Sequence, residues 1–375
     1  MSPTEEFEAE SSNIVIAVRA ALALFGSLLG LILSLPILVV GLPFWITAVG
    51  TRLIARRLVP RTVRWQEIIE FDFRFGWKPK PNLNVQCFGD DVFRVTTGPD
   101  GWRGNISLAE CDIVVLGDSF AFGYGVNEQA MFAELIPNVR VKPIGAPGYN
   151  LVQELLVLRE YCSQLTGKLI VWFVFLGNDP WDNLYPYMQN HTTPFLRRVN
   201  IDSDWQIETS HISAKTRPYK SQEWHDQHIR EMLADICSAT YIAERAYSAC
   251  GHLIREAQSI CDNHGARLCV FTVPDRTQLS LDNLERLREC SASPESFNPA
   301  LPDLRISEIC AKLGVMFVAG RDHLNKDDYR TVDRHWNETG HRRVAEILGK
   351  LRQNAHIIHG LHNDGVQERP PWMRS

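Results

Sequence analysis

Five residues suited to acyl chemistry stand in four short, widely spaced segments of the chain. Ser119 follows a glycine and an aspartate, Gly148 ends a Gly-Ala-Pro-Gly run, and Asn178 lies in a Gly-Asn-Asp run. Asp333 and His335 are two positions apart in Asp-Arg-His-Trp-Asn. A serine hydroxyl becomes a good nucleophile when an imidazole takes its proton, and the imidazole needs a carboxylate to orient it. Ser119, His335 and Asp333 are therefore predicted as nucleophile, base and orienting carboxylate.

The same segments offer donors for an oxyanion. Attack on an acyl carbon creates a negative oxygen, which needs N–H groups about 3 Å away. We expect the backbone N–H groups of Ser119 and Gly148 and the side-chain amide of Asn178 to fill this role. Each feature also has an ordinary structural interpretation, since serine caps helices and an Asp-x-His pair is common in turns. His341 is the competing base.

The first three segments each follow an apolar run that is typical of a buried strand. These runs are Ile113–Leu116, Val139–Ile144 and Leu169–Leu176, whereas the fourth segment opens a helix. Helical patterns near Glu128–Ile136 and at Leu151–Gln164 separate the strands. The alternation predicts a parallel sheet, whose strand ends would bring the segments to one edge.

The pattern continues along the second half of the chain, after an insertion rich in aromatic residues. We expect further elements at His228–His264 (helix), Arg267–Val273 (strand), Leu281–Arg288 (helix), Leu304–Leu313 (helix), Val315–Val318 (strand) and Glu338–Gln353 (helix). A short strand, Phe93–Thr96, lies among turn residues before the first buried strand.

The order of the four segments resembles the four blocks of the SGNH (GDSL-type) hydrolases over roughly residues 111–350. The matching residues are Ser119 in GDSF, Gly148 in GAPGYN, Asn178 in GND and His335 in DRHWN. The resemblance implies a three-layer α/β/α, flavodoxin-like fold with Ser119, Asp333 and His335 as triad and Gly148 and Asn178 as oxyanion donors. The final block is DxHWN instead of the usual DxxH, which is similar to a membrane-linked branch that handles polysaccharide acetyl groups. Pro143 stands where the second block usually has asparagine.

These features favour a serine esterase or deacylase that acts through an acyl-enzyme, without a cofactor. The substrate would be an ester, such as an O-acyl group on a saccharide or lipid. An O-acyltransferase using the same triad is the alternative, because only the acceptor differs. A non-catalytic, membrane-tethered binding protein is the second alternative.

Four parts are expected along the 375 residues. Residues 1–66 form a tail, membrane anchor and basic juxtamembrane segment, and residues 67–110 form a small β element. Residues 111–353 form the hydrolase-like domain, with an aromatic-rich insertion at 180–226 that could be a lid or substrate wall. Residues 354–375 form a flexible tail.

The anchor is predicted because residues 20–51 contain no charged side chain, and about 20 apolar residues suffice to cross a bilayer as a helix. Pro36 and Pro43 leave a single kinked span and a hairpin both open. Five arginines follow the run and favour a cytoplasmic domain, whereas the resemblance to enzymes of exported polysaccharide favours the opposite side. The arginines are Arg52, Arg56, Arg57, Arg61 and Arg64.

Composition and charge disfavour several other classes of protein. The net charge of −5 and the absence of a basic module beyond the first 65 residues disfavour a nucleic-acid partner. The nine cysteines are scattered without CxxC pairs, which disfavours a disulfide framework or a zinc site. His335 and His341 are six positions apart, so the segment is not the HExxH zinc motif, and no metal is expected.

Overall fold

The structure is a computed structural model that describes residues 18–29, 47, 62–188, 190–198, 200, 203–215 and 222–363. It divides into two compact units, Met1–Arg61 and Thr62–Ser375. In the first unit, residues 18–29 are helical. None of the helices in the described ranges has the length and apolar character needed to cross a membrane. Most of the predicted anchor, residues 20–51, lies outside these ranges, so the anchor stays a prediction.

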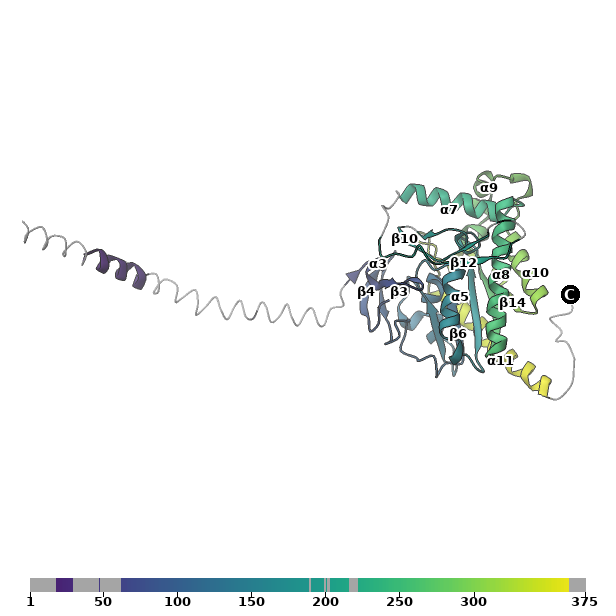
Figure 1. Ribbon diagram of the computed structural model, residues 1–375, viewed down its shortest axis with the longest axis horizontal. Coiled ribbons are helices and arrows are strands. Elements are labelled where there is room, and N and C mark those ends of the chain that lie inside the picture. Colours follow the sequence, from purple (N-terminus) through teal and green to yellow (C-terminus); the bar gives the residue numbers. More distant parts are fainter. Residues whose placement is uncertain are drawn as a thin grey trace, which may run out of the picture. The chain divides into compact units, whose positions relative to one another are not determined.

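A five-stranded parallel sheet forms the centre of the second unit (Figure 1). Its strand order is β14-β13-β8-β6-β7, which is the flavodoxin-like order. The two central runs, Ile113–Gly117 and Leu169–Phe175, form strands because they are continuous apolar segments rich in branched and aromatic residues, as expected for strands buried on both faces. The bounds are β6 (Ile113–Gly117), β7 (Val141–Gly145), β8 (Leu169–Phe175), β13 (Arg267–Val273) and β14 (Met316–Ala319).

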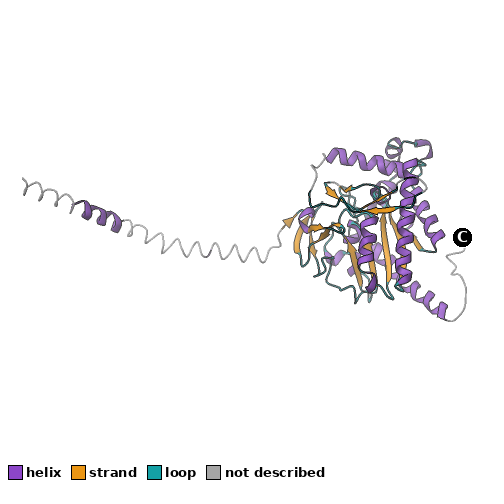
Figure 2. Cartoon of the chain, viewed as in Figure 1, coloured by secondary structure: helices purple, strands orange, loops and turns teal. Residues whose placement is uncertain are grey.

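Helices cover both faces of this sheet (Figure 2), so the predicted three-layer α/β/α architecture is confirmed. Successive residues of β8 point to opposite faces, because the strand period is two. Trp172 belongs to a core shared with α5 (Leu151–Glu160), α8 (Tyr241–Asn263) and α10 (Leu301–Leu313). Phe173 belongs to a second core, shared with α11 (Glu338–Asn363).

The small β element is not an independent domain, because its apolar side chains join the larger core. Phe75, Trp77 and Phe93 are at most 2% exposed within that core. The predicted strand Phe93–Thr96 is confirmed within β5. The elements are β1 (Thr62–Val63), α3 (Trp65–Ile68), β2 (Ile69–Asp72), β3 (Gly76–Pro79), β4 (Asn84–Phe88) and β5 (Val92–Thr96).

The described part of the aromatic-rich insertion forms two short hairpins after α6 (Asp179–Asp182). The first pairs β9 (Tyr187–Met188) with β10 (His191–Thr192). The second pairs β11 (Phe195–Arg197) with β12 (Gln206–Glu208). The chain then enters α7 (Gln222–Ile236).

Two helix predictions are wrong. The single helix expected near Glu128–Ile136 is instead a pair of 3-10 turns, η2 (Glu128–Ala130) and η3 (Phe132–Glu134), because Met131 between them is extended, with ψ 141°. The long helix expected at His228–His264 is divided into α7 and α8. Thr240 is extended and caps α8, since its hydroxyl accepts a hydrogen bond from the Ala243 N–H.

The remaining elements follow the prediction closely. Helix α9 spans Leu281–Glu289, and α11 begins at Glu338 as expected but continues to Asn363, beyond the predicted start of the tail at 354. Short 3-10 turns complete the fold: η4 (Cys162–Gln164), η5 (Arg276–Leu279), η6 (Pro294–Ser296), η7 (Gly320–Asp322) and η8 (Lys326–Asp328).

Candidate active site

Ser119 lies at the carboxyl end of β6, beside the point where the strand order reverses. It is the first residue of the short helix α4 (Ser119–Phe122), and Asp118 caps that helix by accepting a hydrogen bond from the Phe120 N–H at 2.9 Å. Gly117 is needed for close packing, because a Cβ there would lie 3.0 Å from the Cβ of Ala121 and 3.1 Å from that of Phe173. The sequence thus presents the hydroxyl at the sheet edge.

His335 reaches Ser119 across 216 positions of the chain. Its Nε2 lies 2.7 Å from the Ser119 Oγ, a distance suited to proton transfer. The imidazole packs between the rings of Phe120 and Tyr124, with centroids 5.1 and 4.9 Å away. The side chain is 22% exposed. Packing therefore fixes the ring while its reacting edge stays accessible.

Asp333 lies beside the other nitrogen of the imidazole. Its Oδ1 is 3.5 Å from His335 Nδ1, longer than a normal hydrogen bond, and accepts the His335 backbone N–H at 3.0 Å. Burial acts to raise the pKa of Asp333, but the His335 side chain and backbone N–H outweigh it and hold that pKa below its ordinary value. The carboxylate is therefore ionised at neutral pH and can stabilise an imidazolium.

Arg334 explains how two residues so close in sequence can both face inward. Its φ is +63°, a left-handed conformation that is uncommon for a residue with a side chain. Its guanidinium lies 3.6 Å from Asp275 Oδ2, which holds the turn. The sequence suggested a turn here, but neither this conformation nor the role of Asp275.

Gly148 and Asn178 lie just after the carboxyl ends of β7 and β8, the two strands that pair with β6. Gly148 has φ +78°, which favours glycine, and a Cβ there would contact Met188 Cγ at 3.4 Å and Trp77 at 3.6 Å. The insertion and the small β element thus both reach this loop. Asn178 Nδ2 donates a hydrogen bond to Asp182 Oδ2, which orients the amide, and among the described residues its second N–H has no partner and can act as a donor.

His341, the competing base, is buried elsewhere. It is 1% exposed, its Nδ1 accepts the Phe132 backbone N–H at 3.3 Å, and its ring stacks on that of Phe132. Burial, followed by the positive charge of Arg103, lowers the pKa of His341 to about 3. It is a neutral structural acceptor.

Four carboxyls lie beneath the site: Asp118, Glu154 and Asp179 are buried and Asp182 is half-buried. Sequence reasoning gave Asp118 and Asp179 structural turn and hydrogen-bond roles near the site, and it missed Glu154 and Asp182. Burial raises the pKa of Asp118 and of Asp182 to about 6, and that of Glu154 and Asp179 well above the ordinary range. Asp118 Oδ2 is 3.4 Å from the Ser119 Oγ, and Glu154 accepts the Trp172 indole N–H. Glu154 lies within an otherwise apolar helix face, which was the one available signal.

Arg103 is a second feature that the sequence did not reveal. It is 1% exposed, and its guanidinium donates to the carbonyls of Phe122, Gly123, Val126 and Arg94. The first two belong to the carboxyl end of the helix that Ser119 opens. A buried cation therefore fixes the segment that follows Ser119.

All nine cysteines are free thiols. Within the residues that the structure describes, no group of three or more His, Cys, Asp or Glu side chains could hold a metal ion.

No protein-family model and no curated protein matches this chain. Solved structures that match include a GDSL-like lipase from Bacteroides thetaiotaomicron, at 12% identity and TM-score 0.33, over 65% of this chain and 88% of that one. A carbohydrate acetylesterase family member from Sinorhizobium meliloti matches at 12% identity and TM-score 0.34, over 64% and 95%. Another carbohydrate acetylesterase from Sinorhizobium meliloti matches at 9% identity and TM-score 0.36, over 66% and 98%. All three are named as ester hydrolases, and those activities belong to the proteins named.

Proposed function

We propose that this chain is a serine esterase or deacylase of the SGNH type. The contact of 2.7 Å between Ser119 Oγ and His335 Nε2, at the carboxyl edge of the sheet, is the observation that carries the proposal. A capping serine and a structural histidine have no need to meet at this distance. Asp333 is ionised beside the imidazole, which supplies the charge that a general base requires.

In the proposed reaction, Ser119 Oγ attacks the ester carbonyl while its proton passes to His335 Nε2. The tetrahedral oxyanion would accept hydrogen bonds from the backbone N–H groups of Ser119 and Gly148 and from the Asn178 amide. Collapse of the intermediate breaks the ester C–O bond, and His335 gives its proton to the leaving alcohol. Water, activated by the same imidazole, then hydrolyses the acyl-enzyme and restores Ser119.

The substrate is proposed as an O-acyl group on a saccharide or lipid. The contact of Met188 with the Gly148 position supports a role for the insertion as one wall of the site. A saccharide acceptor in place of water would make the same residues an O-acyltransferase. Analysis of products with and without a saccharide acceptor separates hydrolysis from transfer.

Labelling with a fluorophosphonate tests the nucleophile, because this probe reacts with activated serines. We expect stoichiometric labelling of the wild type and of Ser107→Ala, whose hydroxyl is a surface group bonded to Glu110. Ser119→Ala should lose both labelling and hydrolysis of short-chain esters while its melting temperature is retained. Labelling that persists in Ser119→Ala would assign the nucleophile elsewhere, and an unlabelled wild type would favour a non-catalytic binding protein.

We further propose that residues 20–51 attach the protein to a lipid bilayer. The uncharged run supports this, and the arginines that follow would favour a cytoplasmic domain. Retention in the membrane fraction after carbonate extraction is the expected result, and release by carbonate would oppose it. Digestion of the domain by protease added to intact spheroplasts would place it on the outer side.

A further inference from the structure

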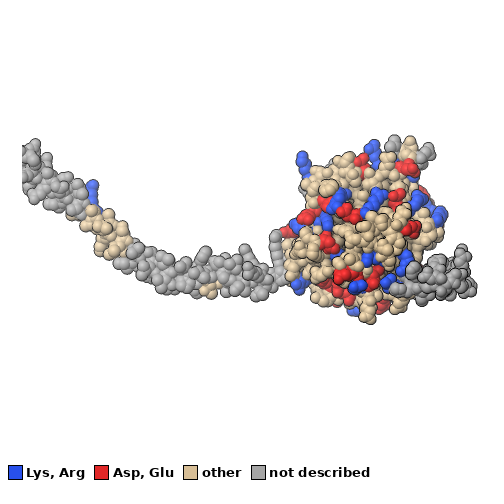
Figure 3. Space-filling model, turned by 60° about the horizontal axis from the view of Figure 1, so that its bottom comes forward, with Lys and Arg blue, Asp and Glu red and all other residues tan. Residues whose placement is uncertain are grey.

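A hollow of about 370 Å³ lies away from the candidate active site. It is bordered by α8, by α10 and by the segment of the insertion that contains β11 and β12, and none of Ser119, Asp333 and His335 lines it. On the face drawn in Figure 3, basic and acidic side chains are interspersed. Where charges of both signs are mixed, a charged ligand is recognised by the few side chains that it contacts. The charged side chains that line the hollow therefore decide which ligand it can bind.

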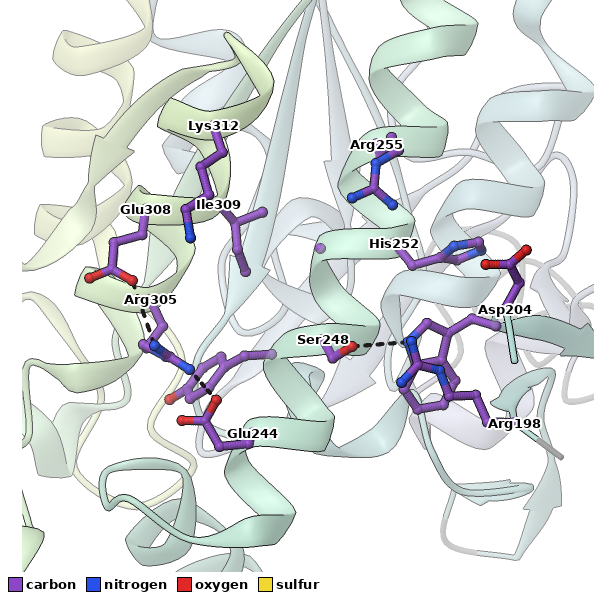
Figure 4. Close-up of a pocket in the computed structure, with 13 residues that line it drawn as sticks. Arg198, Asp204, Glu244, Ser248, His252, Arg255, Arg305, Glu308, Ile309 and Lys312 are labelled. Atoms are coloured by element: carbon purple, nitrogen blue, oxygen red, sulfur yellow. Dashed lines mark hydrogen bonds and ion pairs between the residues drawn. The ribbon is translucent and has the colours of Figure 1, made fainter. Parts of the chain in front are cut away.

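The acidic side chains of the hollow already face partners. Arg305 forms ion pairs with Glu244 and Glu308, and Asp204 lies beside the imidazole of His252 (Figure 4). The acidic side chains of the hollow are therefore not available to the remaining basic side chains that line it.

Three cations remain. Arg255 from α8 and Lys312 from α10 both extend toward the open space (Figure 4). Arg198 stands on the opposite wall with its guanidinium 4.5 Å from the Trp205 ring centre, and its Nε is buried without a hydrogen-bond partner. Among the described residues, no carboxylate oxygen forms an ion pair with any of the three. Cations that line one hollow without an acidic partner favour an anion in it.

The floor of the hollow supplies an independent observation. Gly251 lies in the interior of α8, where glycine is a poorer helix former than alanine. The three heavy atoms nearest to a Cβ at this position would all belong to Ile309, at 3.7–3.8 Å, which is ordinary van der Waals contact. Helix packing therefore does not require glycine here. The absence of a side chain at Gly251 leaves more space in the hollow, which Trp205 and Ser248, hydrogen-bonded to each other, also line.

We propose that this hollow binds an anionic group, a carboxylate or a phosphate, carried by a small ligand. Its size lies at the lower end of ligand pockets, which are roughly 300–1,000 Å³. Arginine binds either group through two parallel hydrogen bonds, and lysine adds a point charge. The site is separate from Ser119 and does not depend on the proposed ester chemistry.

Isothermal titration calorimetry of the full chain tests the proposal with inorganic phosphate, glucuronate and, as the uncharged comparison, glucose. We expect saturable binding of phosphate or glucuronate that weakens with added salt, and no binding of glucose. The phosphate and glucuronate arms decide which anion is preferred. The double variant Arg255→Gln/Lys312→Met should bind at least tenfold more weakly. Arg159→Gln is the matched control, because this exposed arginine pairs with Glu256 outside the hollow, and it should bind within twofold of wild type.

Gly251→Leu fills the hollow without removing a charge. It should abolish binding while the melting temperature stays at or above that of wild type, since leucine favours the helix. Absence of binding by the wild type would overturn the proposal. The proposal would also be overturned if the double variant, or Gly251→Leu, bound the anion as tightly as the wild type does. Because no ester is hydrolysed in the titration, these outcomes are independent of Ser119 activity.

Discussion

Replacing Arg103 by methionine should lower kcat by more than the loss of folded protein accounts for. The guanidinium donates to Phe122 O at 3.1 Å, to Gly123 O, to Arg94 O at 2.9 Å and to Val126 O at 2.7 Å. These carbonyls lie at the end of the Ser119 helix, in the following loop and in β5. Arg103 is therefore a positioning residue for the nucleophile, and its loss should let this segment shift.

The magnitude follows from burial and hydrogen bonding. Hydrogen bonds to a charged group contribute about 1.5–3 kcal/mol each. Burial of the guanidinium also has a desolvation cost, which is why the pKa of Arg103 is lowered to about 10. We expect a net loss of roughly 2–5 kcal/mol in the free energy of unfolding, out of a total of about 5–15 kcal/mol. A displacement of Ser119 by about 1 Å should lower kcat by roughly 10²-fold.

Lys168→Met is the matched control. Lys168 is also buried, and its Nζ donates to the carbonyls of Ala109 at 3.3 Å and Cys111 at 2.8 Å, at the amino ends of the strands and far from the site edge. Kinetics and fluorophosphonate labelling rates should be compared at a temperature where both variants are folded. Arg103→Met should lose kcat and labelling rate with little change in KM, Arg103→Lys should recover part of both, and Lys168→Met should retain them. Equal kcat values for Arg103→Met and Lys168→Met would refute the positioning role.

Three further predictions concern the site and the carboxyls beneath it. His335→Gln should reduce ester hydrolysis nearly to background, whereas His341→Gln should retain activity with a lower melting temperature; the reverse ranking would identify His341 as the base. Asn178→Ala should lower kcat by roughly 10²-fold with little change in KM, and a change in KM alone would make Asn178 a substrate contact. Burial raises the pKa of Asp182 from 3.8 to about 6, so the protonated form favours the folded state below pH 4 and this stability is lost as pH rises through 6. The free energy of unfolding of Asp182→Asn, measured relative to that of wild type by urea denaturation, should therefore rise by about 3 kcal/mol from pH 4 to pH 8. The same difference between variant and wild type at both pH values would contradict this.

The sheet was predictable because its signal is local. Strands β6 and β8 are continuous apolar runs that end in Gly or a polar turn, and their burial on both faces makes their boundaries clear in the sequence. The helix boundaries were less predictable. The division between α7 and α8 depends on Thr240, whose capping role competes with a helical pattern that continues on both sides. The break at Met131 likewise arises where that side chain becomes 1% exposed, which is a tertiary effect.

The candidate site was predictable in its residue types and less so in its geometry. The order of Ser119, Gly148, Asn178 and His335 placed all four at the sheet edge, and the structure brings Ser119 and His335 into contact. The groups that position them carry no local signal. Arg103 resembles any arginine in a turn-rich segment until its four carbonyl partners are assembled from distant parts of the chain.

The small β element connects the separate parts of the candidate site. Arg103 binds the segment that follows Ser119. The Trp77 indole donates to Pro147 O at 3.1 Å, and the Tyr149 hydroxyl donates to Trp77 O at 2.6 Å, so β3 holds the loop that contains Gly148.

The turn between β4 and β5 holds the remaining segment. Asp90 Oδ2 accepts the Asp333 backbone N–H at 3.2 Å, and Asp91 forms an ion pair with Arg330 at 2.8 Å. The segments that carry Ser119, Gly148 and Asp333 are therefore all bonded to one element that lies before the parallel sheet in the sequence. The separation of 2.7 Å between Ser119 and His335 depends on both segments being held against this common support. The element is thus part of the framework of the proposed site, and a shortened chain that kept only the sheet and its helices would lack the contacts that hold these segments.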